Sequence, residues 1–188
     1  MNIDRDVALF VMLGQTAERA INRLEDVVPS ESLYLSSAYD LATVLPEGVR
    51  SASKASEAYK LLFVFEKYLR QLTVEVLAGD GSANWWDLVP PDVQSEVKRL
   101  EETEETKSWM ALGSRDKSAL MTLPQLLKVI EHNWKGAFED VIRDRGLIQE
   151  ARLLIHLRNT ICHMSAIPEE ELARVRQTMR DWFRVVAP

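Results

Sequence analysis

Apolar residues recur every three or four positions along most of this chain, and that period constrains its fold more than any other feature. The spacing matches the turn of an α-helix, so each such segment presents one apolar stripe to a core. Residues 33–35 and 61–64 come nearest to a strand pattern, but the runs are too short or lie inside helical segments. The sequence therefore predicts an all-α bundle.

Prolines, glycines and capping residues divide the chain into seven expected helices. The expected spans are 6–28, 30–46, 51–77, 92–107, 123–142, 147–165 and a last helix from 168 to about 186. We expect the first two to form an N-terminal helical hairpin, as an extension over residues 1–50. The other five are expected to be the core helices of a domain over residues 51–188.

The hexapeptide Arg158-Asn159-Thr160-Ile161-Cys162-His163 carries the most suggestive chemistry. Histidine can take and return a proton near neutral pH. Arginine offers a charged fork of donors that suits phosphate oxygens, and asparagine can orient a neighbour without titrating. These three side chains suit cleavage of RNA by its own 2′-hydroxyl, where the protein supplies proton transfer and charge stabilisation. The alternative is that they are ordinary polar residues on a helix.

The expected helix 147–165 places these residues on two faces, because each residue turns the helix by about 100°. Arg158 falls within the apolar stripe, where an arginine is costly unless it is paired. Arg152, His156, Asn159 and His163 fall on the opposite face. This polar face either meets solvent or joins a second copy, which would gather two Arg158 and two His163 in one cleft. The stripe comprises Leu147, Ala151, Leu154, Ile155, Ile161 and Cys162.

The Arg-Asn-x3-His string resembles the signature of the HEPN superfamily of small helical domains. Further similarity follows in order along the chain and covers roughly residues 55 to 185. It rests on Phe65-Glu66, Leu69-Arg70, Trp85-Trp86, Pro90-Pro91, Leu126-Leu127, Asn133-Trp134 and Phe138, ahead of Arg158-Asn159. These residues resemble the subfamily found fused to PIN-type nucleases in eukaryotes and free-standing in bacteria.

The resemblance implies a metal-independent endoribonuclease that acts as a homodimer and leaves 2′,3′-cyclic phosphate and 5′-hydroxyl ends. It implies catalytic roles for Arg158, Asn159 and His163, and a place in phage defence, toxin–antitoxin pairs or stress responses. An antitoxin, a partner nuclease or another defence protein is then an expected partner. A non-catalytic module that binds RNA, a nucleotide or a protein, or only dimerises, remains the alternative.

Four further residues are candidates for supporting roles: Glu66, Arg70, Arg152 and His156. Glu66 and Arg70 lie four positions apart and can pair with each other on one helical face. Alternatively, Glu66 neutralises Arg158 inside the bundle.

The two adjacent tryptophans, Trp85 and Trp86, can either fill the core from their loop or stack on bases. The first interpretation is favoured.

Charge and composition add constraints on substrate and compartment. The chain has 23 basic against 29 acidic side chains, which argues against tight sequence-independent RNA binding. The portion from Arg143 onward is more basic, with eight arginines against six acids. The expected helix 92–107 carries an acidic cluster, which predicts a solvated face. We expect no membrane span, no cofactor and no metal site, and the single Cys162 fits a cytoplasmic location.

Overall fold

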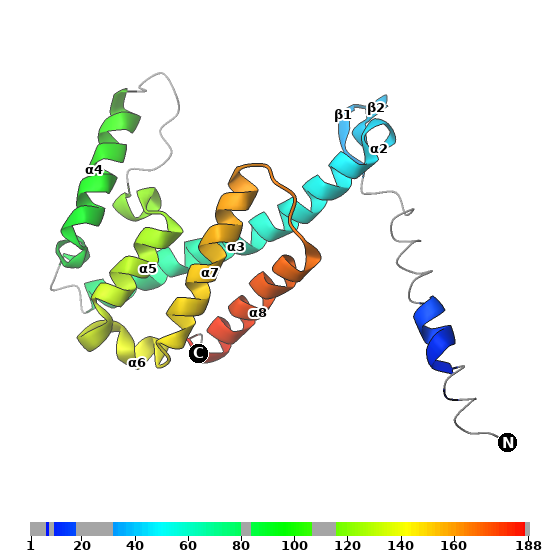
Figure 1. Ribbon diagram of the computed structural model, residues 1–188. Coiled ribbons are helices and arrows are strands. Elements are labelled where there is room, and N and C mark those ends of the chain that lie inside the picture. Colours follow the sequence, from blue (N-terminus) through cyan, green and yellow to red (C-terminus); the bar gives the residue numbers. More distant parts are fainter. Residues whose placement is uncertain (1–6, 8–9, 18–31, 80–83, 107–115, 187–188) are drawn as a thin grey trace. The chain divides into compact units, whose positions relative to one another are not determined.

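The computed structural model describes residues 7, 10–17, 32–79, 84–106 and 116–186 (Figure 1). The chain divides into two compact units, residues 1–53 and residues 54–188. Helices make up nearly all the regular structure of the second unit, so the expected all-α class is confirmed. The candidate site lies wholly within this second unit.

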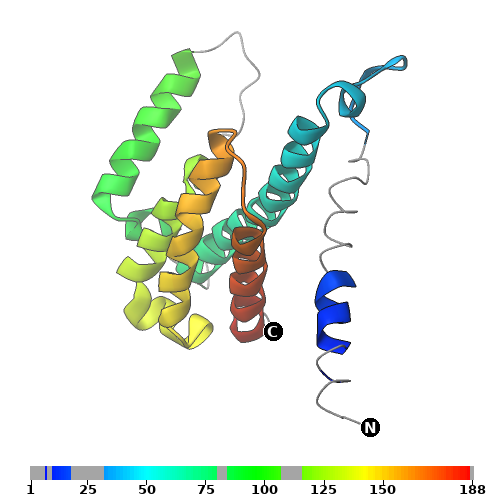
Figure 2. The same ribbon diagram turned by 45° about the vertical axis from the view of Figure 1, so that its right-hand side comes forward.

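In the described residues of the second unit there are six α-helices, counting α3, which begins before residue 54, and three short turns of 3-10 or π-helix. Their bounds are α3 (Pro46–Ala78), η1 (Trp85–Leu88), α4 (Pro91–Thr106), η2 (Lys117–Leu120), α5 (Leu123–His132), η3 (Trp134–Phe138), α6 (Glu139–Ile142), α7 (Gly146–Cys162) and α8 (Glu169–Val185). Figure 1 and Figure 2 both show α7 between α5 and α8, and α7 contacts both.

The core forms where the stripe of α3 meets α8. Ala58, Leu62, Phe65 and Leu69 recur at helical spacing and are buried. The Phe65 ring meets Trp182 of α8 edge to face, with ring centroids 5.3 Å apart. Other apolar side chains, on the solvent side of α3, are exposed, and some of them line the candidate site.

The expected helix over 30–46 is wrong. Strands β1 (Tyr34–Ser36) and β2 (Tyr39–Asp40) pair antiparallel, and only the short helix α2 (Leu41–Val44) follows. The carboxylate of Asp40 explains the change, because its Oδ1 accepts from the backbone N–H groups of Leu33 and Ala42, each at 2.9 Å. Pro46 then begins α3 instead of ending a helix.

The expected N-terminal helical hairpin is therefore wrong in its second arm. Of its first arm, expected over 6–28, residues 10–17 are helical. Apart from residue 7, the rest of that span lies outside the described residues.

The single helix expected over 123–142 is also wrong, because it breaks after α5. Gly136 has φ = 88° and Lys135 has ψ = 123°, neither of which a helix accommodates. The Asn133 amide donates to the Leu88 carbonyl at 3.0 Å, and the Gly136 N–H donates to Glu139 at 2.9 Å. These contacts replace the helical hydrogen bonds and turn the chain before α6.

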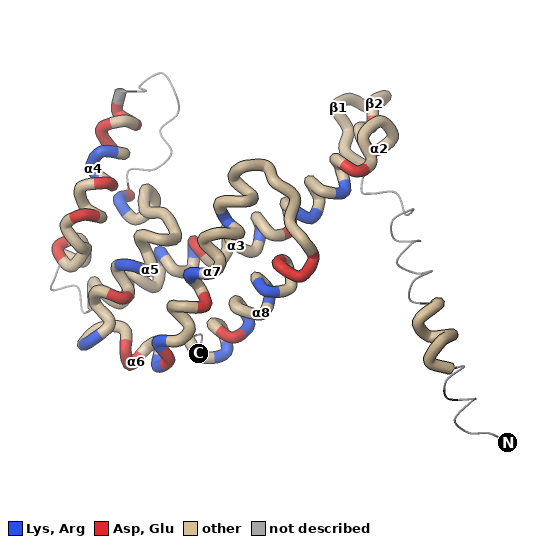
Figure 3. The backbone as a smooth tube through the Cα atoms, in the orientation of Figure 1, with Lys and Arg blue, Asp and Glu red and all other residues tan. Residues whose placement is uncertain are grey.

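Trp85 and Trp86 pack against the core, as the favoured interpretation predicts. Their rings meet edge to face at 5.4 Å, and the Lys117 ammonium lies 4.7 Å from the Trp86 centroid. Charged residues recur along α4 (Figure 3). Most of them lie on exposed positions, while Val93 and Val97 are buried. The predicted solvated acidic face is thus confirmed.

Candidate functional site

Four side chains of α3 form one face beside the core stripe. Tyr59, Phe63, Glu66 and Arg70 are spaced by four, three and four residues, which places them on one side of a helix. Together with residues of α7 they enclose a cavity of about 250 Å³. Its lining consists of Tyr59, Leu62, Phe63, Glu66, Arg70, Arg158, Ile161 and Cys162. The structure therefore brings three of the predicted site residues, Glu66, Arg70 and Arg158, to one place.

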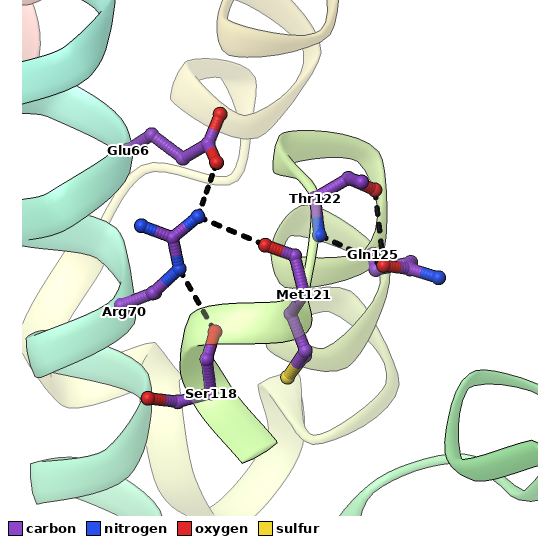
Figure 4. Close-up of polar contacts among 6 residues, drawn as sticks. All are labelled: Glu66, Arg70, Ser118, Met121, Thr122 and Gln125. Carbon is purple, nitrogen blue, oxygen red and sulfur yellow. Dashed lines mark hydrogen bonds and ion pairs between the residues drawn. The ribbon is translucent and has the colours of Figure 1, made fainter. Parts of the chain in front are cut away.

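Arg70 is held by three acceptors (Figure 4). Its guanidinium pairs with Glu66, donates from Nε to the Ser118 carbonyl at 2.8 Å, and donates from Nη2 to the Met121 carbonyl at 3.0 Å. The Arg70 and Glu66 side chains are only 23% and 16% exposed. The predicted pairing of these two residues is confirmed, and it ties α3 to the segment before α5.

Arg158 projects from α7 into the same cavity and is half-buried between the buried Leu157 and Ile161. Its expected place on the core side of α7 is confirmed. Within the part of the chain that the structure describes, no ion pair or hydrogen bond is found for its guanidinium, so the alternative pairing with Glu66 is not observed. The cavity thus holds two arginines against one glutamate, and the glutamate is already engaged by Arg70.

The helix that carries the motif ends at Cys162, three residues before the expected end. His163 caps α7 with φ = −89°, and Met164 adopts φ = 56°. The Met164 N–H donates to the Ile161 carbonyl at 2.9 Å, and the Ser165 N–H donates to the Thr160 carbonyl at 3.1 Å. These are the two bonds of a Schellman turn, with Met164 at the position that glycine usually occupies.

The polar face of α7 is exposed, as expected. His156, Asn159 and His163 are all exposed, and none of them lines the cavity. Arg152, on the same face, pairs with Glu131 of α5. Cys162 is exposed rather than buried, which corrects its place in the predicted apolar stripe.

Sequence reasoning missed the aromatic part of the cavity. Tyr59 and Phe63 are 54% and 56% exposed, and their ring centroids lie 6.0 Å apart with a 33° angle between the planes. The available signal was two aromatic residues four positions apart, directly following two core positions of the α3 stripe. The carbonyl partners of Arg70 were also missed, since they lie 48 and 51 residues away.

Most of the elements around this site lie within a region that matches a known protein family. A family model described as Swt1-like HEPN matches residues 60–187. The match covers more than half of the chain, and the chain belongs to this family. A HEPN domain indicates ribonuclease-type function in general terms. No curated protein and no solved structure matches the chain.

Membrane spans and metal clusters are the two other features that bear on the kind of site. Among the helices described, none has the length and apolar character to cross a bilayer. Likewise, over the described ranges, His, Cys, Asp and Glu side chains nowhere gather in threes that could hold a metal ion.

Proposed function

We propose that this protein is a metal-independent endoribonuclease that cleaves RNA to 2′,3′-cyclic phosphate and 5′-hydroxyl ends. The observation that carries the proposal is the state of Arg158, a half-buried cation in a cavity whose glutamate already pairs with Arg70. Such a cation is costly without an anion, and a phosphate oxygen supplies one. The family match supports the ribonuclease class.

In the proposed reaction, a base removes the proton of the 2′-hydroxyl, and the 2′-oxygen attacks the adjacent phosphorus. The bond from phosphorus to the 5′-oxygen breaks, and an acid returns a proton to that leaving oxygen. His163 serves as base or acid, Arg158 stabilises the pentacoordinate phosphate, and Asn159 orients the pair. No metal takes part in this scheme.

We further propose that the working unit is a homodimer. In one chain, Arg158 lines the cavity whereas Asn159 and His163 lie outside its lining and are exposed. A second copy placed against the exposed face of α7 would supply the missing acid–base group, because a two-fold axis gathers equivalent residues. One His163 would then act as base and the partner's His163 as acid.

The decisive assay incubates the purified protein with mixed-sequence RNA in EDTA. Replacing His163 by alanine should lower the cleavage rate by about 10²-fold or more, the usual contribution of a positioned acid or base. His132→Ala is the matched control, because His132 is also exposed and lies at the end of another helix, α5. End-group analysis should find cyclic phosphate. Equal inactivity of the wild type and His163→Ala would reject the enzyme.

A mass measurement in solution tests the dimer separately. The proposal requires a dimer under assay conditions, and a strict monomer that cleaves RNA would reject the shared-cleft scheme.

The biological setting that we propose is the cytoplasm, in phage defence, a toxin–antitoxin pair or a stress response. An antitoxin, a partner nuclease or another defence protein would control the activity.

One observation favours a second candidate, a binding module without turnover. Because Arg158 and His163 do not share the cavity of one chain, a protein that never dimerises would hold phosphate without acid–base chemistry. This candidate predicts RNA binding that depends on Arg158 and is indifferent to His163.

A further inference from the structure

A second cavity adjoins the first along α3. Its volume is about 440 Å³, and its lining includes Phe63, Lys67, Arg70 and Glu75 of α3, Ser118 of η2, and Asp116 just before η2. Phe63 and Arg70 line both cavities. The two hollows therefore share a wall, and the Phe63 ring is its apolar part.

The Phe63 ring has the exposure that stacking requires. It is 56% exposed, although the core positions on either side of it along α3, Leu62 and Phe65, are buried. Tyr59 extends the aromatic surface by one turn. Trp85 and Trp86, in contrast, pack against the core. Among the described residues, Phe63 is the aromatic side chain that lines both cavities. A flat apolar ligand can therefore reach its ring from either cavity.

Positive charge flanks the ring on both sides. Arg158 lines the first cavity. Lys67 lines the second together with the carboxylates of Glu75 and Asp116, and the Asp116 carboxylate accepts two hydrogen bonds from Ser118. Over the described residues, neither side chain is found in an ion pair, whereas Arg70 at the shared wall is engaged by Glu66. The order of cation, aromatic ring and cation suits a ligand that alternates phosphates with flat bases.

We propose that Phe63 is the base-stacking residue of a single-stranded RNA track along α3, with one backbone phosphate at Arg158 and a neighbouring phosphate at Lys67. This inference rests on the proposed ribonuclease function and adds to it the residues that hold the strand beside the reacting phosphate. A base on Phe63 separates the two phosphates, so the strand crosses the shared wall of the two cavities. Stacking tolerates every base, so the track predicts weak sequence preference.

The test measures binding to the full-length His163→Ala protein, so that cleavage does not consume the probe. Two fluorescent probes of equal length are compared, an oligoadenylate and a sugar-phosphate oligomer without bases. The oligoadenylate should bind roughly tenfold more tightly, the usual effect of one stacked base. Phe63→Leu should abolish this preference, and Phe63→Trp should keep it.

Charge at the second cavity is tested with Lys67→Gln. This change should weaken both probes equally and reduce the salt dependence of binding by about 0.7 in log–log slope, as expected for one lost phosphate contact on a single strand. Matched controls are Val64→Ala and Lys60→Gln. Val64 is also 56% exposed, both residues lie on α3, and neither lines either cavity.

Three results would overturn the inference. The first is a preference for bases that persists in Phe63→Leu, and the second is no preference in the parent protein. The third is a Phe63→Leu protein that becomes monomeric, because the ring would then be a contact between copies. Cleavage by the wild-type protein is measured alongside: cleavage without base preference rejects only the stacking role, and base-dependent binding without cleavage rejects only the nuclease.

Discussion

Glu66 lies one helical turn before Arg70 on α3 and accepts a hydrogen bond from its guanidinium, which also donates to two backbone carbonyls. Arg70 therefore neutralises the one carboxylate of the Arg158 cavity. The same guanidinium stabilises the chain turn before α5, so a single side chain serves both the fold and the electrostatics of the site.

Replacing Arg70 should be costly to stability. We expect Arg70→Met to lower the free energy of unfolding by about 2–3 kcal/mol, because Glu66 loses its cation and two carbonyls lose a donor. Glu66→Gln should cost less than about 1 kcal/mol, since its amide oxygen still accepts the bond. Urea denaturation measures both. Equal losses for the two variants would contradict the asymmetry.

Arg158 should show the opposite balance between stability and activity. Arg158→Met should leave the free energy of unfolding unchanged or raise it by about 0.5 kcal/mol, because the half-buried cation has no ion-pair or hydrogen-bond partner among the described residues. RNA cleavage should fall by about 10²-fold or more. Arg145→Met is the control for the loss of one arginine charge. Arg145 lies just before α7, is not part of the cavity lining, and pairs with Glu131 at 3.4 Å. A marked loss of stability in Arg158→Met would reveal a structural role instead.

Met164 occupies a left-handed backbone position at which glycine is favoured. We expect Met164→Gly to raise the free energy of unfolding by about 0.5–1 kcal/mol, because φ = 56° costs a side chain that glycine lacks. The Met164 side chain is 92% exposed, so its loss should cost little packing. Met164→Ala should bring no gain. A thermal melt of the three proteins is sufficient, and a gain in the alanine variant would point away from backbone strain.

Gly136 should resist substitution for the same reason. Gly136→Ala should cost about 1 kcal/mol in chemical denaturation, because φ = 88° is unfavourable for alanine although open space surrounds the new methyl group. Gly48→Ala is the matched control. Gly48 lies within α3 at ordinary φ, with a new Cβ 3.7 Å from that of Leu45, so alanine should stabilise there. Destabilisation at both positions would argue for steric rather than conformational cost.

Stability should fall at alkaline pH through Tyr68. Partial burial, with a smaller contribution from Glu75, raises the pKa of the Tyr68 phenol above its ordinary value of 10.0. The neutral phenol is thus favoured in the folded protein, and its stabilising effect is complete below the unfolded pKa. It is lost as the pH rises through the folded pKa. Tyr68→Phe should flatten this decline in unfolding experiments, whereas Tyr34→Phe, at an exposed position, should not.

The helices that could be predicted are those whose apolar period coincides with a clear start or stop. Helix α4 begins at Pro91, one residue before its expected start, and Pro168 precedes the acidic first turn of α8, as predicted. The failures occur where a single side chain redirects the backbone. Asp40 holds two N–H groups beside the β-hairpin, and Asn133 bonds across to Leu88 before the Gly136 turn. Helical spacing does not reveal such bonds.

The candidate site, like the fold, could be predicted from the sequence only in part. The core-side position of Arg158 and the pairing of Glu66 with Arg70 both follow from local helical geometry. The exposure of Phe63 does not, because it depends on which distant segments cover a given face of α3. The early end of α7 also escaped prediction, since Met164 stands where a glycine would have given the signal.

The end of α7 at Cys162 separates the motif into parts of unequal local stability. Arg158 lies inside α7, which packs between α5 and α8, so displacing its backbone requires melting part of that helix. His163 follows the last helical residue, and opening of the turn there breaks only a few hydrogen bonds. The histidine can thus leave its place while the arginine keeps its own. Under the proposed roles, turnover could stop at this turn while the RNA stays bound.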